Sequence, residues 1–180
     1  MSKYFSMLRG INVSGQKKIK MNELISLYES LSFKNVTTYI QSGNVLFDSS
    51  ADNLVSLAEK IEKEIKKEFL FEVPVIIRTK EELKHIIKTN PFLKREDIDH
   101  SKLHITFLTK TVKKPIPPKI METKSAEDEF FTSNKEIYLF CPKGYGRTKY
   151  NNNFFERYLS MNATTRNWNT IMAISRLMDV

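Results

Sequence analysis

The chain has 180 residues, a formal net charge of +8, a single cysteine and 28% charged residues. This length allows one domain or two small ones, and it buries enough surface to fold without a disulfide or a structural metal. Cys141 cannot form an internal bridge, and no apolar run is long enough for a signal segment or a membrane span. We therefore expect a cytoplasmic protein that makes no membrane contact.

The excess positive charge lies at the two ends of the sequence. Residues 1–35 carry six basic and two acidic side chains, and residues 141–180 again carry six and two, a net +4 at each end. The remaining residues, 36–140, balance, with 29 − 12 = 17 basic and 21 − 4 = 17 acidic side chains. One interpretation is an ordinary solvated surface. The other is that the two ends meet and form a face that attracts anions.

The first half of the chain alternates strand and helix patterns. Short apolar, aromatic or β-branched runs predict four strands, at Tyr4–Leu8, Val36–Gln41, Asn44–Phe47 and Val73–Arg78. Apolar residues at helical spacing predict a helix over about 21–31, and Ser49-Ser50-Ala51-Asp52 reads as the cap of a second helix. The order β-α-β-β-α-β predicts a ferredoxin-like arrangement, an antiparallel sheet with helices on one face.

Three of these strands carry apolar side chains on both faces, whereas a sheet covered by helices on one side should have a polar second face. Two explanations stay open. The second half of the chain covers this face, or the face stacks bases as RNA-recognition domains do. Burial by the second half is favoured, because Ser42–Phe47 matches the RNA-recognition signature poorly.

The second half begins with a capping box at Thr79-Lys80-Glu81-Glu82, which opens a short helix that ends at Asn90-Pro91. Strands are predicted at 103–107, 129–132 and 136–140, and the last two form a hairpin. A Pro-rich segment leads into a short helix or turn near 119–124. Helices are predicted over about 151–160 and from Thr164 or Thr165 to about 178.

These patterns predict an α/β (α+β) protein of two ferredoxin-like halves, with helices packed on antiparallel sheets. We place the halves at residues 1–78 and 79–180 and expect them to share one core. The second half repeats the element order of the first only incompletely, as α-β-α-β-β-α-α. The last helix places Trp168, Ile171, Met172 and Ser175 on one face, so we expect Trp168 to be buried.

Two basic segments that contain glycine connect strand patterns to helix patterns. Arg9–Met21 holds two glycines, an asparagine and four cations without an acidic residue, and Gly144–Lys149 precedes three asparagines. Glycine lets the backbone approach a ligand closely, and cations, hydroxyls and the N–H groups of a helix start suit a phosphate. Neither segment matches a known nucleotide-binding motif. The competing interpretation is that both are ordinary connections that need glycine for their turns.

Other residue types give little support for catalysis. His85, His100 and His104 are scattered, without cysteine or carboxylate at metal-ligand spacing, so we expect no metal and no cofactor. Cys141 reads as a packed thiol, and Ser42 lacks the pattern of a nucleophilic serine. We assign no catalytic residue, and whether the protein is an enzyme stays open.

Five sequence blocks are spread over nearly the whole chain and are specific when taken together: Leu8–Val13 with Lys20-Met21, Tyr39–Val45, Asn90–Phe92, Gly146–Lys149 and Thr165–Thr170. Together they resemble a bacterial family, domain-of-unknown-function family 1697. Ser14 stands where members of that family usually have a glycine. The resemblance implies a compact α/β protein of two ferredoxin-like halves, and it implies no activity.

We expect the protein to bind a phosphate-bearing ligand. Nucleic acid is favoured as the partner, because the positive charge is high and concentrated. The alternatives are an enzyme that acts on a small phosphorylated or nucleotide substrate, and a structural or protein-interaction module. At least two of the four cations Arg9, Arg147, Lys149 and Arg166 are expected to converge on one concave surface. The predicted anion-binding residues are Arg9, Asn12, Lys17, Arg147, Lys149, Arg166 and Asn167.

Overall fold

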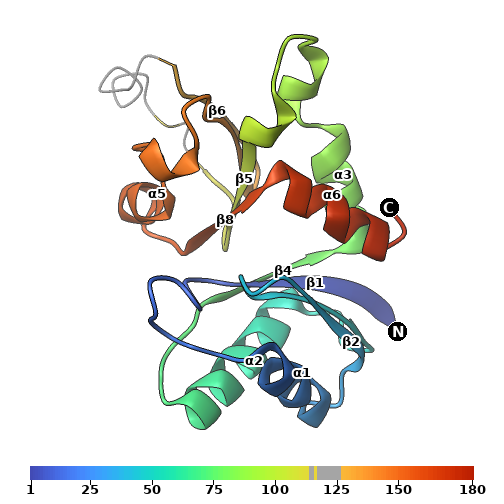
Figure 1. Cartoon of the computed structure of the whole chain (residues 1–180). Helices are drawn as coiled ribbons and strands as arrows, with labels where there is room; N and C mark the ends of the chain where they lie inside the picture. Colours follow the sequence, from blue (N-terminus) through green and yellow to red (C-terminus); the bar gives the residue numbers. More distant parts are fainter. Residues whose placement is uncertain (114–115, 117–126) are drawn as a thin grey trace. The chain divides into compact units, whose positions relative to one another are not determined.

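The computed structural model describes residues 1–113, 116 and 127–180 (Figure 1). The helix or turn predicted near 119–124 lies outside these residues. The chain divides into two compact units, residues 1–85 with 177–180, and residues 86–176. Each unit contains one four-stranded antiparallel sheet, which confirms the predicted α+β fold class. None of the described helices combines the length and apolar character that a membrane span requires.

The first unit has the predicted β-α-β-β-α-β order. Its strands lie side by side in the order β2-β3-β1-β4, which is the ferredoxin-like arrangement. The elements are β1 (Ser2–Leu8), α1 (Met21–Ser30), β2 (Lys34–Tyr39), β3 (Asn44–Ser49), α2 (Leu54–Phe69) and β4 (Val75–Thr79).

The core of the first unit lies between the sheet and helices α1 and α2, which cover one face (Figure 1). Strand residues at every second position, such as Tyr4, Val45 and Phe47, pack there against Leu24 and Ile61 of the helices. The alternate strand residues point to the other face, and they are apolar as well: Phe5, Met7, Leu46 and Ile76. The sheet is therefore apolar on both faces, and a core shared by the two halves stays a prediction.

The two predicted helix caps have different outcomes. The Thr79 box is confirmed, since the Glu82 carboxylate accepts from Thr79 N at 2.9 Å and the Thr79 hydroxyl accepts from Glu82 N at 3.1 Å. The cap predicted at Ser49–Asp52 is wrong, because Asn53 Oδ1 caps α2 by accepting from the backbone N–H groups of Val55 and Ser56. Ser49 is instead the last residue of β3, and its hydroxyl accepts from Ala51 N.

The second unit repeats the sheet order of the first, as β6-β7-β5-β8. The boundary between the units falls inside α3 (Lys80–Lys88), which ends before Asn90-Pro91 as predicted. The further elements are the 3-10 turns η1 (Pro91–Lys94), η2 (His100–Lys102) and η3 (Tyr145–Arg147), the strands β5 (Leu103–Leu108), β6 (Glu129–Ser133), β7 (Glu136–Phe140) and β8 (Ala163–Asn167), and the helices α5 (Asn152–Leu159) and α6 (Trp168–Leu177).

Strand β8 corrects the prediction that the last helix begins at Thr164 or Thr165. Both threonines are β-branched and lie in an antiparallel pairing with β5, where the Thr165 hydroxyl is 2.7 Å from the Thr106 hydroxyl. The helix begins at Trp168, and Asn167 Oδ1 accepts from Asn169 N at 2.9 Å. The second unit therefore contains all four strands of the ferredoxin-like order, one more than predicted.

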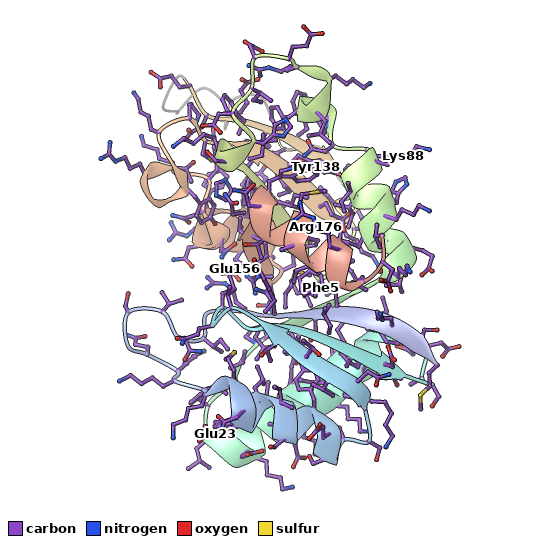
Figure 2. The ribbon with its side chains drawn as sticks, turned by 45° about the vertical axis from the view of Figure 1, so that its right-hand side comes forward. Phe5, Glu23, Lys88, Tyr138, Glu156 and Arg176 are labelled. Carbon is purple, nitrogen blue, oxygen red and sulfur yellow. The ribbon has the colours of Figure 1, made fainter. Side chains whose placement is uncertain are left out.

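Both faces of the second sheet are covered. One face packs against α5 in a cluster that includes Leu108, Leu139 and Phe155, and α6 lies on the other side of the sheet (Figure 1). The Tyr138 hydroxyl of β7 donates to the Ile86 carbonyl of α3 at 3.1 Å, and Figure 2 shows Tyr138 in the interior of this unit. Trp168 is 4% exposed, which confirms the prediction that it is buried.

The turn between β2 and β3 packs directly on the end of β1. Gly43 has a φ of +73°, and a Cβ added to it would lie 2.7 Å from Leu8 Cβ and 2.9 Å from Ile11 Cδ1. Leu8 N donates to the Gly43 carbonyl at 2.8 Å. Because the neighbouring atoms belong to buried side chains, only glycine fits at this position.

Replacing Gly43 by alanine should lower the free energy of unfolding by about 2–4 kcal/mol, from steric overlap plus a left-handed backbone. The matched control is Gly10→Ala, since Gly10 also has a φ of +75° but no atom lies within 4 Å of the added Cβ. The control should cost only about 1 kcal/mol. Denaturant titration followed by circular dichroism measures both values, and equal losses would show that the turn does not pack as described.

Candidate functional site

The loop that follows β1 has an unusual density of left-handed backbone conformations. Positive φ angles occur at five positions within eight residues, namely Gly10, Asn12, Ser14, Gly15 and Lys17. For a residue with a side chain this conformation costs about 1–2 kcal/mol relative to the right-handed one. Three of the five are not glycine, so contacts elsewhere must hold the loop in this shape.

Asn12 supplies most of those contacts. Its Nδ2 donates to the carbonyls of Ile19 and Gln41, at 2.9 Å each, and its Oδ1 accepts from Ile19 N at 2.9 Å. Its backbone N–H donates to the Lys17 carbonyl at 3.2 Å. One side chain thus closes the loop on itself and ties it to the β2–β3 turn. Asparagine also tolerates its φ of 55° better than most residues do.

Two further bonds fix the loop to the segment before β4. Lys17 Nζ donates to the Glu72 carbonyl at 2.6 Å, and Arg9 N donates to the Pro74 carbonyl at 2.9 Å. Val13 and Gln16 pair across the tip of the loop, with Gln16 N donating to the Val13 carbonyl at 3.0 Å. The loop is therefore held at its base, its middle and its tip.

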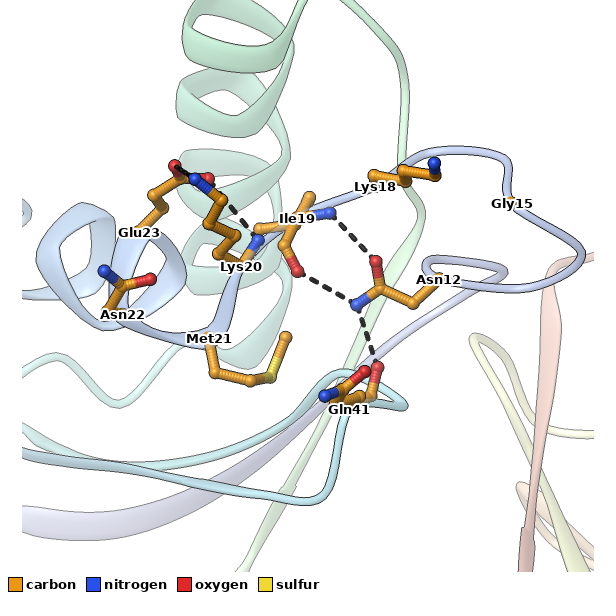
Figure 3. A pocket seen from close by; sticks show the side chains of 9 residues that line it. All are labelled: Asn12, Gly15, Lys18, Ile19, Lys20, Met21, Asn22, Glu23 and Gln41. Atoms are coloured by element: carbon orange, nitrogen blue, oxygen red, sulfur yellow. Dashed lines mark hydrogen bonds and ion pairs between the residues drawn. The ribbon is translucent and has the colours of Figure 1, made fainter.

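The loop forms a pocket of about 600 Å³ beside the start of α1 (Figure 3). It is lined by five residues of the loop, by the first turn of α1 and by the β2–β3 turn: Asn12, Gly15, Lys18, Ile19, Lys20, Met21, Asn22, Glu23 and Gln41. We call this the loop pocket. Figure 3 shows Lys18 and Gly15 at one end of it, and Met21, Asn22 and Gln41 at the other.

The two lysines of the loop pocket differ in their surroundings. Lys20 Nζ lies 3.5 Å from Glu23 Oε1, and the other oxygen of that carboxylate accepts from Lys20 N at 3.4 Å. The Glu23 carboxylate therefore already places a negative charge at the start of α1. Within the described part of the chain, Lys18 Nζ has neither an ion pair nor a hydrogen bond. An anion in the pocket would meet its positive charge chiefly at Lys18.

Sequence reasoning placed Lys17 in the site and missed Lys18, Asn22 and Gln41. Adjacent lysines are equivalent in a sequence, and only the conformation of the loop shows that Lys17 binds the Glu72 carbonyl while Lys18 lines the pocket. Gln41 did lie in one of the blocks that carried the family resemblance, and that was the available signal.

The predicted site residues are distributed over both units. Arg9, Asn12 and Lys17 belong to the loop of the first unit, while Arg147, Lys149, Arg166 and Asn167 belong to the second. Their convergence on one concave surface stays a prediction.

In the second unit, Arg147 and Lys149 are exposed in the segment that leads to α5. The helix start that follows them is already capped, since Asn151 Oδ1 accepts from Phe154 N at 3.0 Å. Arg166 is buried, and its Nη1 donates to the Thr164 hydroxyl at 2.8 Å and to the Thr165 carbonyl at 2.9 Å. Of these three predicted cations, Arg166 therefore has a role inside the fold, while Arg147 and Lys149 lie at the surface.

His104 and Asn167 face each other across β5 and β8, and their bonds fix the protonation of the imidazole. Nδ1 lies 3.1 Å from the Lys102 carbonyl, which can only accept, so Nδ1 carries the hydrogen. Nε2 accepts from Asn167 Nδ2 at 3.2 Å, and that amide also donates to the Ser101 carbonyl. Burial lowers the pKa of His104, so the neutral ring is the stable form.

Tyr145 anchors the Gly144–Lys149 segment to the same part of the sheet. Its ring stacks on His104 with a centroid distance of 5.0 Å, and its hydroxyl donates to Thr165 Oγ1 at 3.0 Å. The Thr165 hydroxyl in turn donates to Asn152 Oδ1 at 2.6 Å. Cys141, nearby in sequence, is buried as predicted, and burial raises the pKa of its thiol to about 12, which makes it a poor nucleophile.

The His104 contacts predict a pH dependence of stability. The folded protein disfavours protonation of this ring, and the unfolded chain does not. The stability is therefore complete above the unfolded pKa of 6.5 and is lost as the pH falls through the lower folded pKa. The contribution should fall by no more than about 1.4 kcal/mol per pH unit. Unfolding titrations between pH 5 and 8 should show this loss in the parent and in His100→Gln, whose histidine is exposed. His104→Gln should have the flatter profile, and an unchanged profile would contradict the assignment.

The fold and site describe an α+β protein of two ferredoxin-like units with a loop pocket in the first. Residues 1–138 match the model of the family described as "Protein of unknown function (DUF1697)". The chain therefore belongs to this family, as the sequence blocks indicated.

A conserved bacterial protein from Streptococcus pneumoniae has a similar structure, with a TM-score of 0.70 at 22% sequence identity. The similarity covers 98% of each chain, and it supports the fold alone. No curated protein matches the chain. Among the described residues, no group of three or more His, Cys, Asp or Glu side chains is placed to hold a metal ion.

Proposed function

We propose that the protein binds a phosphate-bearing ligand in the loop pocket, with nucleic acid as the first candidate. The observation that supports this proposal is a pocket of about 600 Å³ in which Lys18 has no partner among the described residues. The volume lies within the range of about 300–1,000 Å³ that is usual for ligand pockets. Asn12 holds the pocket in shape before any ligand arrives, so binding needs little reorganisation.

The electrostatics of the loop favour an anion. Residues 9–20 contain four cations and no acidic residue. Two like charges 4 Å apart repel by about 4 kcal/mol at an effective dielectric constant of about 20, so a bound anion is stabilised wherever such side chains approach one another. The net charge of +8 adds a long-range attraction for polyanions, which favours nucleic acid over a neutral partner.

A second candidate is an enzyme that acts on a small phosphorylated or nucleotide substrate. The concave shape of the loop pocket favours it, because an extended polyanion needs a surface track rather than a pocket. A structural or protein-interaction module is the third candidate, and it requires no ligand at all. Anion binding at Lys18 separates the first two candidates from the third.

Inorganic phosphate should stabilise the protein against heat more than chloride does at equal ionic strength. At about ten times its Kd a bound ion adds about 1.4 kcal/mol. The double variant Lys18→Gln with Lys20→Gln should lose this gain. The matched control is Lys34→Gln with Lys63→Gln, which removes the same charge from exposed positions outside the pocket and should keep the gain.

The control is needed because anions such as phosphate also stabilise proteins by exclusion from their surface. Equal gains in the parent and in both double variants would show that exclusion explains the whole effect. The loop would then be an ordinary connection between β1 and α1.

If nucleic acid is the partner, log K should fall linearly with log salt concentration, by about 0.7–0.9 for each phosphate contacted. Fluorescence anisotropy with single- and double-stranded oligonucleotides at several salt concentrations measures this slope. Lys18→Gln should reduce it by about one contact, whereas Lys63→Gln should leave it unchanged. Absence of binding at low salt would leave the small phosphorylated substrate as the candidate ligand.

A further inference from the structure

The two ends of the loop pocket offer different chemistry (Figure 3). Lys18 and Gly15 form one end, where a cation and a backbone without a side chain are available. Met21, Asn22 and Gln41 form the other end, beside Lys20 and Glu23, whose opposite charges are paired with each other. A ligand that fills the pocket therefore needs an anionic part and an uncharged part.

The end at Met21 contains two carboxamides that the fold does not use. Among the described residues, neither the Asn22 nor the Gln41 side chain has a hydrogen bond, whereas every polar atom of the Asn12 amide is engaged. A carboxamide combines an acceptor oxygen with two donor hydrogens. A phosphate can accept hydrogen bonds from the NH₂ groups, but it leaves the carboxamide oxygens without a donor. The edge of a nucleobase has both donors and acceptors, so it can bond the NH₂ groups and the carboxamide oxygens.

Met21 adds a surface for the flat face of a base. Its thioether lies between the two carboxamides in Figure 3, and the side chain is only partly buried. Sulfur of methionine makes favourable contacts with aromatic rings, and an unbranched side chain adapts to their shape. A sugar phosphate has no aromatic ring and would gain little from this contact.

We propose that the ligand of the loop pocket is a nucleotide, with its phosphate at Lys18, its base against Met21 and the edge of the base at Asn22 and Gln41. This inference rests on the proposed function and names the class of ligand. The nucleotide can be free or part of a single strand. A base within a duplex is stacked and paired, and it cannot enter a pocket in this way.

Isothermal titration of the full chain with four probes tests the proposal: inorganic phosphate, ribose 5-phosphate, the four common nucleoside 5′-monophosphates, and single-stranded oligonucleotides of the same bases. At least one monophosphate should bind about tenfold tighter than ribose 5-phosphate. Asn22→Ala and Gln41→Ala should each weaken that monophosphate by about three- to tenfold, the worth of one neutral hydrogen bond. Both variants should leave the affinity for inorganic phosphate unchanged, and Lys18→Gln should weaken all four probes.

Gln16→Ala is the matched control, because it removes an exposed carboxamide of the same loop that does not line the pocket, and it should change nothing. Tighter binding of an oligonucleotide than of its monophosphate, with the same sensitivity to Gln41→Ala, would identify single-stranded nucleic acid as the source. Equal affinities for ribose 5-phosphate and the monophosphates would overturn the nucleotide assignment and leave the proposed phosphate site intact. Failure of every probe to bind would overturn both.

Discussion

The hydrogen bonds of one carboxamide determine the shape of the loop after β1. Asn12 bonds both the N–H and the carbonyl of Ile19 and the carbonyl of Gln41, so three chain segments meet at its side chain. Left-handed conformations at Ser14 and Lys17 would not persist in an isolated peptide, and these contacts compensate for their cost. The hydrogen bonds of Asn12 thus hold the loop in the shape that forms the loop pocket.

The ferredoxin-like sheet provides the rigid base on which that loop stands. Strand β1 lies between β3 and β4 in the first sheet, and the loop begins at its end, next to the β2–β3 turn. Gly43 lets this turn approach Leu8 and Ile11 at distances that no other residue permits. The backbone carbonyl of Gln41 is thereby placed within reach of Asn12, and its side chain lines the pocket. The β2–β3 turn thus packs on the sheet through Gly43 and contributes Gln41 to the loop pocket.

The second unit uses its polar residues differently. His104, Asn167, Tyr145 and Thr165 form a network in which each side chain has a hydrogen-bond partner or a stacked ring. This network orients the Gly144–Lys149 segment and caps α6. It also uses the amide of Asn167, which the sequence predicted as a ligand contact, for hydrogen bonds within the fold. A basic residue such as Arg166 can therefore bond within the fold instead of facing a ligand.

The sequence alone determined the fold class, seven of the eight strands that the structure describes and most of the described helices, because periodicity of apolar residues records which face each element buries. It missed β8, since Ala163–Asn167 is short, polar and directly followed by a helical pattern, and only its pairing with β5 makes it a strand. It also located the loop and its charge. Tertiary structure decided which side chains of that loop are used internally and which line the pocket. Asn12 and Lys17 bond to carbonyls of distant residues, and such long-range partners leave no trace in local sequence.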